Sequence, residues 1–320
     1  MPAISRRRLL LGSAGAWALT ACSRRAAAEL PRVSITLAPS YTQDLYGSLR
    51  RILSEHKLEV RGRRVVLKPN LVEYDPAAPI NTNPLLVHAA LEAFSALGAA
   101  EVRIAEGPGH RRGTLELAEA AGYFRTIPGF ERMFTDLNLD DTSLVRLRRP
   151  ASRLESLYLP HTVLGADLVV SIPKMKTHHW VAATLGMKNL FGVVPGGIYG
   201  WPKNVLHWAG IDGCIADLHR VFPRVFTIVD GIVGMEGNGP IQGRPKAAGV
   251  IVAGRDMVAV DATCCRIMGI DPEMVGYLKL EETQGQTRAE GVRQIGEALG
   301  RVRTDFELLP AFSGFRLRRA

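Results

Sequence analysis

The stretch Leu168-Val-Val-Ser-Ile-Pro-Lys-Met-Lys-Thr-His-His179 joins a short apolar run to a proline and then to a segment rich in lysine and histidine. A β-branched run of this length that ends at a proline is typical of a strand buried on both faces of a sheet. Comparable runs occupy residues 33–38, 65–68, 102–105, 225–229 and 250–253. Amphipathic stretches at 85–97, 211–222 and 257–268 alternate with them. The pattern predicts an α/β fold with a mostly parallel sheet and helices on both faces, forming a single main domain.

Residues that favour helix ends support this assignment. Asn83 followed by Pro84 is typical of an N-cap with proline in the first turn of the helix. Asp256 is expected to cap the helix at the end of the alternating pattern in the same way. Asp261, further along that helix, either points toward a site or pairs with Arg266. Residues 124–160 are less regular, and two short strands are expected there, at 144–147 and 156–159.

Composition restricts the class of protein. The chain has 320 residues, of which 47% are hydrophobic and 22% charged, values that are ordinary for a globular protein and exclude a disordered or fibrous one. Five arginines and no acidic residues lie in residues 1–28, so the formal net charge of +9 falls to +4 for the remainder. A mild and scattered positive charge favours small anionic ligands and does not support nucleic-acid binding.

The first residues have the features of an export signal. Ser5-Arg-Arg-Arg-Leu-Leu-Leu11 is followed by an apolar stretch that is too short to span a membrane, and then by Leu19-Thr-Ala-Cys22. Paired arginines predict a twin-arginine signal, with its export machinery as a partner, and the last four residues are typical of a lipobox that ends at Cys22. The alternative is an ordinary cleaved signal with an incidental cysteine. We therefore expect an exported protein that is periplasmic, or a membrane-anchored lipoprotein facing outside the cytoplasm.

The chain divides into three parts on this evidence. They are a twin-arginine and lipoprotein signal (1–28), an α/β domain (29–310) and a basic tail (311–320). The domain contains the cysteines Cys214, Cys264 and Cys265, with no Cys-x-x-Cys pair, so no iron–sulfur cluster is expected. We expect these cysteines to be buried on helices, while a disulfide from Cys214 to one of the other two is the alternative.

Charged and histidine-rich segments follow the predicted strands, where ligands bind in open α/β sheets. They are Lys68-Pro-Asn70, Glu106-Gly-Pro-Gly-His-Arg111, the segment 173–179 and the glycine-rich segment 230–240. The residues expected to bind an anionic substrate are Lys68, Asn70, His110, Lys174, Lys176 and Asn189. Lys188, His178 and His207 are the candidate catalytic residues, because a desolvated lysine can act as base or nucleophile and histidine transfers protons near neutral pH. Asp230 and Glu236 are candidate ligands for a divalent metal.

These segments resemble the family known as domain of unknown function 362. The resemblance rests on Lys68-Pro-Asn-Leu71, Thr82-Asn-Pro84, Ala105-Glu-Gly-Pro-Gly109, Pro173-Lys-Met-Lys-Thr-His178, Gly186-Met-Lys-Asn-Leu-Phe-Gly192 and Asp230-Gly-Ile-Val-Gly-Met-Glu-Gly-Asn-Gly-Pro240. Many members of that family carry an added ferredoxin-like module, whose cysteine runs this sequence lacks.

A more distant resemblance is to the amino-terminal domain of the nickel-pincer lactate racemases. The corresponding positions are His110 with Arg111, Lys188 before Pro195-Gly196, and His207. In that family the lysine carries the pincer cofactor, and histidines bind metal or move protons. The resemblance implies a similar architecture.

Three functions are compatible with these features. The first is an exported enzyme that binds an anionic substrate or cofactor through the lysine and histidine site, with or without assistance from a metal. The second is a non-catalytic periplasmic lipoprotein that binds an anion. The third is an accessory factor for a redox enzyme, which the ferredoxin modules of relatives suggest and the missing cysteine runs oppose.

Overall fold

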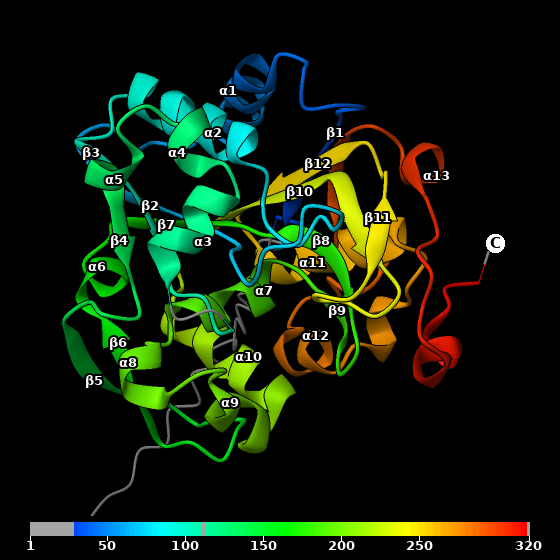
Figure 1. Ribbon diagram of the computed structural model, residues 1–320. Coiled ribbons are helices and arrows are strands. Elements are labelled where there is room, and N and C mark those ends of the chain that lie inside the picture. The colour runs from blue at the N-terminus through cyan, green and yellow to red at the C-terminus, as the bar shows by residue number, and fades with distance from the viewer. Residues whose placement is uncertain (1–28, 111–112, 319–320) are drawn as a thin grey trace, which may run out of the picture.

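A central mixed β-sheet organises the chain in the computed structural model, which describes residues 29–110 and 113–318 (Figure 1). Its main strands are β1 (Arg32–Leu37), β2 (Arg64–Pro69), β3 (Glu101–Glu106), β4 (Phe134–Asp136), β7 (Leu168–Ile172), β10 (Val225–Glu236), β12 (Val250–Gly254) and β13 (Arg293–Gly296). The signal predicted over residues 1–28, including Cys22, and residue Arg111 lie outside the described residues.

The strand order is β13-β1-β12-β10-β7-β2-β3-β4. From β10 to β4, each strand is parallel to its neighbour, whereas β12 is antiparallel to both β10 and β1. The chain returns from β10 to β12 without a helix, and such a short return suits an antiparallel neighbour because a parallel one needs a longer crossover. The predicted α/β fold with a mostly parallel sheet is confirmed.

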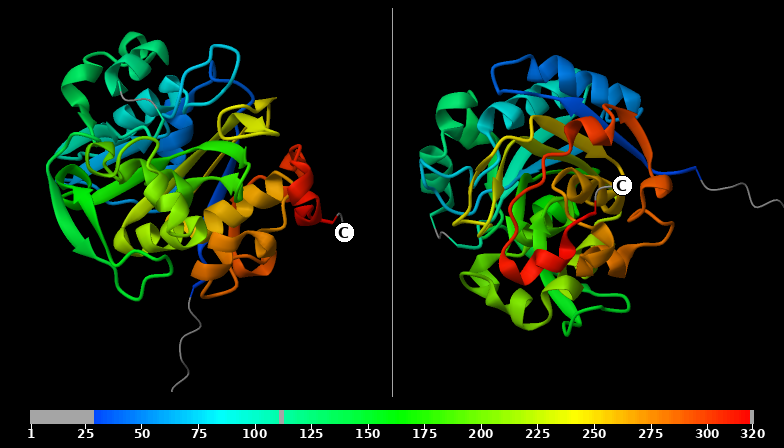
Figure 2. Two further views of the ribbon diagram at one scale, coloured as in Figure 1. Left: turned by 60° about the horizontal axis from the view of Figure 1, so that its bottom comes forward. Right: turned by 90° about the vertical axis from the view of Figure 1, so that its right-hand side faces the viewer.

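Helices cover both faces of the sheet (Figures 1 and 2). On one face lie α1 (Leu45–Glu55), α2 (Pro84–Ala96), α3 (Thr114–Ala120), α4 (Tyr123–Thr126) and α5 (Phe130–Met133). On the other lie α7 (Gly186–Asn189), α9 (Asn204–Trp208), α10 (Ile211–Val221), α11 (Met257–Ile267) and α12 (Gly276–Glu281). In β7, Val170 and Ile172 pack in the core on the first side, and Val169 packs on the second. Successive residues of a strand point to opposite faces, which is why the apolar run is continuous.

Helix caps form as the sequence predicts. The Asn83 side chain accepts a hydrogen bond from the Leu85 backbone N–H at 2.9 Å, with Pro84 in the first turn. Asp256 accepts from the Ala259 backbone N–H at 2.8 Å. Cys214, Cys264 and Cys265 are free and buried on α10 and α11, so the disulfide alternative is not realised.

Two segments predicted as loops are strands. Residues 174–178 form β8 (Lys174–His178), which pairs with β10 and with β9 (Ala182–Thr184). Beyond the predicted end of the fifth apolar run, β10 continues through Glu236 and pairs with β11 (Arg244–Lys246). These strands were not predicted because their sequences are polar. They bury lysine, threonine and histidine side chains, whereas a buried strand normally has an apolar sequence.

Smaller elements complete the domain. The strands expected near 144–147 and 156–159 form a hairpin, β5 (Thr142–Arg146) with β6 (Ser156–Pro160), outside the main sheet. Further short helices are α6 (His161–Leu164), α8 (Gly196–Tyr199) and α13 (Leu299–Val302), with 3-10 turns at Leu190–Val193, Pro272–Met274, Ala289–Gly291 and Pro310–Phe315. None of the helices in the described parts of the chain is long and apolar enough to cross a membrane.

The predicted basic tail is docked against the domain up to residue 318. Pro310–Phe315 forms a 3-10 helix, and the Phe315 carbonyl accepts a hydrogen bond from the Asp271 backbone N–H at 2.7 Å. The Leu317 N–H donates to the Gly269 carbonyl at 2.9 Å. The last described residues therefore pack beside the end of α11 and do not extend freely from it.

Candidate functional site

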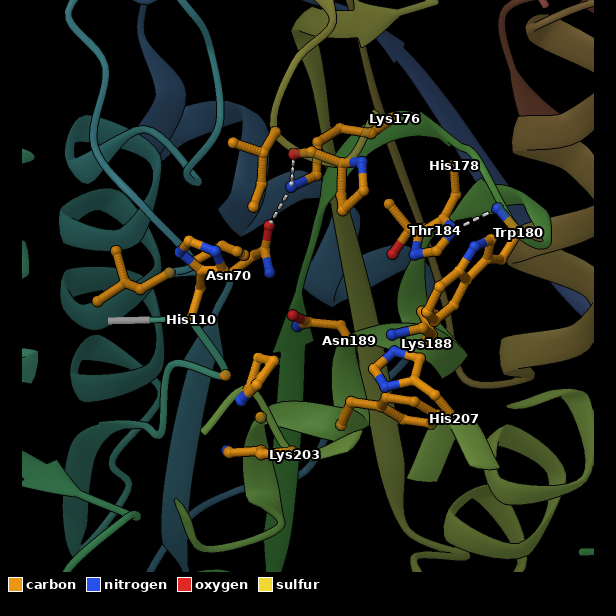
Figure 3. Close-up of a pocket in the computed structure, with 18 of the residues that line it drawn as sticks. Asn70, His110, Lys176, His178, Trp180, Thr184, Lys188, Asn189, Lys203 and His207 are labelled. Carbon is orange, nitrogen blue, oxygen red and sulfur yellow. Dashed lines mark hydrogen bonds between the residues drawn. The ribbon is translucent and has the colours of Figure 1, made fainter. Parts of the chain in front are cut away.

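A cavity of about 450 Å³ lies at the carboxyl ends of β2 and β3, facing β8 and α7 (Figure 3). The sequence-predicted site residues that line it are Asn70, His110, Lys176, His178, Lys188, Asn189 and His207. Glu106, His179, Trp180, Phe191 and Lys203 also line it. The expectation that distant segments converge on one edge of the sheet therefore holds for seven of the named residues.

Lys188 lines the cavity beside Trp180 and His207 (Figure 3). It lies on α7, a single turn, and its Nζ is 3.6 Å from the centroid of the Phe191 ring. Within residues 29–110 and 113–318, its Nζ has no hydrogen-bond acceptor. Burial, and next the charges of Lys203 and Lys68, lower the pKa of Lys188 to about 7. An amine with such a pKa is partly neutral at pH 7 and can act as a base or nucleophile.

A buried carboxylate holds the turn that carries Lys188. The two oxygens of Asp261 accept hydrogen bonds from the backbone N–H groups of Gly186 at 2.8 Å and Met187 at 3.0 Å. A Cβ on Gly186 would lie 2.8 Å from both Asp261 and Thr227, so only glycine allows this approach. Of the two alternatives for Asp261, the structure selects the one directed toward the site.

Lys176 forms the opposite wall of the cavity. Its Nζ donates to the Asn70 side-chain oxygen at 2.8 Å and to the carbonyls of Ile80 at 2.9 Å and Pro240 at 3.3 Å. All three acceptors are uncharged. Burial, and next the charges of Lys174 and Lys188, hold the pKa of Lys176 well below its ordinary value.

Lys203 is a site residue that the sequence did not single out. It is 3% exposed, and its Nζ donates to the Gly107 carbonyl at 2.6 Å. Burial lowers the pKa of Lys203 to about 7. Its φ of 64° lies in the left-handed region, which is uncommon for a residue with a side chain. The only feature of the sequence that could have identified Lys203 was its position between Lys188 and His207, directly after a proline.

The histidines of the cavity are held in defined orientations. His178 Nδ1 accepts from the Trp180 backbone N–H at 3.0 Å, so in the neutral ring Nε2 carries the proton. His179 Nδ1 lies 2.8 Å from the Gly239 carbonyl, which requires the proton on Nδ1 and leaves a lone pair on Nε2. The two rings stack with centroids 4.8 Å apart. Burial, then the charge of Lys188, holds the pKa of His178 well below its ordinary value.

His207 and His110 lie at the sides of the cavity. Burial, then the charge of Lys188, lowers the pKa of His207 to about 4, so this ring is neutral at pH 7. Its Nδ1 is buried and has no hydrogen-bond partner among the described residues. His110 is half exposed, and its Nδ1 lies 2.9 Å from a carboxylate oxygen of Glu73.

Lys68, which the sequence predicts to bind substrate, is not among the residues that line the cavity. It is fully buried beneath the cavity, where its Nζ donates to Glu106 at 2.6 Å and to the Asn189 side-chain oxygen at 3.2 Å. The Asn189 amide in turn donates to the Lys68 carbonyl and to Ser171. Gly192 makes room for this ion pair, since a Cβ there would lie 1.9 Å from the Glu106 oxygen.

Lys174, also predicted to bind substrate, is likewise not among the residues that line the cavity. Its Nζ donates to Asp230 at 2.6 Å and to the Tyr41 hydroxyl at 2.8 Å, away from the cavity lining. Asp230 also accepts from the Tyr41 hydroxyl at 2.8 Å and from the Asn83 backbone N–H at 3.0 Å. The Lys174–Asp230 pair therefore joins the sheet to the start of α2.

Asp230 and Glu236 do not form a common metal site. They lie six residues apart on β10, and neither lines the cavity. Glu236 accepts from Arg244 at 3.1 Å and lies 3.3 Å from the Lys246 Nζ. Both carboxylates are thus paired with cationic side chains. Among the described residues, no group of three or more histidine, cysteine, aspartate or glutamate side chains is arranged to hold a metal ion.

Positive groups dominate the charge balance of the cavity. Lys176, Lys188 and Lys203 face it, while Glu106 is the carboxylate in its lining and is already paired with Lys68. Buried charges are normally compensated by opposite charges, and without compensation their pKa shifts toward the neutral form. Burial is the main cause of the lowered pKa values of the three lysines, and repulsion from neighbouring lysines adds to it.

Fold and site together define an α/β protein with a cationic cavity at the carboxyl ends of its central strands. The chain belongs to the family described as domain of unknown function (DUF362), which matches residues 65–266. It is 29% identical over 269 residues to the thylakoid-associated protein sll1697 of Synechocystis sp. (strain ATCC 27184 / PCC 6803 / Kazusa), covering 79% of each chain.

A likeness among solved structures is to the lactate racemase apoprotein from Thermoanaerobacterium thermosaccharolyticum. The TM-score is 0.48 with 13% sequence identity, over 75% of this chain. This chain spans 57% of the length of that one.

Proposed function

We propose that the protein is an exported enzyme that binds a small anionic substrate or cofactor in this cavity. The observation that carries the proposal is the meeting of Lys176, Lys188 and Lys203 in one cavity whose carboxylate, Glu106, is neutralised by Lys68. An anionic group bound among the three ammonium groups would supply the missing negative charge. Lysine is well suited to phosphate or carboxylate because it acts as a compact point charge. The donors of Lys176 are already bonded to Asn70, Ile80 and Pro240, so this lysine would attract the anion by its charge.

The proposed catalytic groups are Lys188 and the neighbouring histidines. With a pKa of about 7, Lys188 offers both the neutral amine and the ammonium form near neutral pH, which suits general acid–base or nucleophilic chemistry. His178, which presents a protonated Nε2 when neutral, would donate a hydrogen bond to a developing anion. Neutral His207, which lines the same cavity, would exchange a hydrogen bond with the ligand.

Replacing Lys188 by alanine is expected to weaken binding of inorganic phosphate and sulfate by about 10- to 100-fold, since hydrogen bonds to charged groups contribute ~1.5–3 kcal/mol. Titration calorimetry at constant ionic strength measures the affinity. Lys279→Ala is the matched control, because Lys279 is an exposed lysine on α12 outside the cavity. Unchanged affinity in Lys188→Ala would remove Lys188 from the site.

The same titrations separate an enzyme from a non-catalytic anion-binding protein. His178→Gln and His207→Gln should retain most anion binding, because both rings are neutral and add little to the attraction. A chemical role then requires that turnover of an identified ligand be lost in at least one of them. If both variants change thermal stability alone, the non-catalytic alternative is favoured.

Membrane association of the exported protein is part of the proposal. Its support is the twin-arginine and lipobox sequence that ends at Cys22, together with the thylakoid association stated in the name of the cyanobacterial relative. Cys22→Ser is expected to move the protein from the membrane to the soluble fraction in cell fractionation, because a diacyl anchor is lost. An equal membrane share for both forms would contradict a lipid anchor.

A further inference from the structure

An aromatic side chain at the cavity is not used by the proposed anion contacts. Trp180 follows β8 and lines the cavity, yet 54% of it is exposed. Tryptophan is highly buried on average, and an exposed indole in a cavity wall forgoes the burial of a large apolar surface. Figure 3 shows it beside Lys188 and His207.

Two histidines contact the indole ring, and a third fixes the backbone of Trp180. The Trp180 backbone N–H donates to His178 at 3.0 Å. The ring centroid lies 5.1 Å from that of His179 and 4.8 Å from that of His207, with interplanar angles of 79° and 74°. Neither imidazole is stacked in parallel on the indole. The ring is therefore oriented before a ligand binds, and its exposed part is available to contact one.

The size of the cavity also exceeds the needs of a simple anion. A volume of about 450 Å³ is in the range of pockets that hold an organic ligand of drug size, and a phosphate fills only a small part of it. The apolar side chains of Val72, Phe191 and Ile241 line the same cavity. Since Lys188 lies against Phe191, which in turn lies 5.8 Å from the His207 ring, the cationic and aromatic parts are continuous.

We propose that the ligand is an anion that carries a planar unsaturated ring, with the lysines binding the charged group and Trp180 stacking on the ring. This inference rests on the proposed anion site and adds the chemical class of the remainder of the ligand. Stacking on an aromatic side chain is sensitive to the flatness of the ligand, whereas burial of apolar area is not. A flat and a saturated ring on the same anionic group therefore distinguish the two effects.

The test compares methyl phosphate, phenyl phosphate and cyclohexyl phosphate by titration calorimetry. The native protein is expected to bind phenyl phosphate about tenfold more tightly than methyl phosphate, the size of one stacking contact, with cyclohexyl phosphate in between. Trp180→Ala should remove the advantage of the phenyl group and leave methyl phosphate binding unchanged. Trp180→Phe, which keeps a flat ring, should retain part of the advantage. Trp208→Ala is the matched control, because Trp208 is 72% exposed and does not line the cavity.

The possible results distinguish a failure of the ring subsite from a failure of the anion site. Equal binding of methyl and phenyl phosphate by the native protein overturns the ring subsite and leaves the anion site intact. An advantage for phenyl phosphate that survives in a folded Trp180→Ala variant, checked by circular dichroism, also overturns it. Absence of binding by all three compounds, methyl phosphate included, overturns the anion site and the ring subsite with it.

Discussion

Replacing Lys68 by methionine is expected to lower the free energy of unfolding by about 3–5 kcal/mol, the usual cost of removing one partner of a buried ion pair. The variant would leave the Glu106 carboxylate 1% exposed and without its ammonium partner at 2.6 Å. It would also remove a donor to the Asn189 oxygen, in the layer directly beneath the cavity. Urea denaturation followed by circular dichroism at pH 7 measures the loss.

A second variant distinguishes a structural from a ligand-binding role for Lys68. In Lys68→Met/Glu106→Leu both charges are removed, and most of the lost stability should return, because replacing a buried pair by apolar groups is often neutral. The exposed pair Arg288–Glu273 is the matched control, and Arg288→Met should cost at most about 1 kcal/mol. A Lys68→Met protein of native stability that no longer binds phosphate would contradict the structural assignment.

Much of the fold was predictable because the apolar runs are long enough to identify the strands. The run at β7 is buried on both faces, and its continuous valine and isoleucine pattern predicts this burial. The antiparallel direction of β12 was not predictable, because a short apolar run has the same pattern in a parallel strand and in an antiparallel strand. Only the short length of chain between β10 and β12 favours an antiparallel β12 over a parallel one.

The site was predictable as a region and less so residue by residue. Lysines 68, 174 and 176 follow predicted strand ends, and Lys188 lies further along the chain. Nothing in the sequence around these four residues distinguishes a lysine paired with a carboxylate from an unpaired one. The difference arises from carboxylates that are distant in sequence, Glu106 and Asp230, which neutralise the first two. Lys203 was not predicted as a site residue. Its backbone is in the left-handed region, and no residue type in the sequence indicates that conformation there.

Anion affinity is expected to fall as the pH rises above about 7. Lys188 and Lys203 each have a pKa of about 7 without ligand, and a bound anion must raise both values because it stabilises the ammonium form. Below this pH both are already protonated and the affinity is level. Above it each lysine must take up a proton on binding, which costs about tenfold in affinity per pH unit for each lysine involved. Sulfate is the suitable probe because it remains a dianion across the range.

Titration of sulfate binding between pH 6 and 9, at constant ionic strength, measures this slope. Calorimetry in two buffers of different ionisation enthalpy counts the protons taken up. Lys188→Gln should remove about one proton from the uptake and make the slope correspondingly shallower, whereas Lys279→Gln should change neither. The pH dependence of the free energy of unfolding has the opposite sign to the pH dependence of sulfate affinity. A lysine pKa that folding lowers makes the free protein less stable as the pH falls from about 10 toward 7, and bound sulfate should offset this loss. An affinity that stays level from pH 6 to 9 would show that neither lysine is neutralised in the free protein, and the cationic cavity would then have to hold its charge by other means.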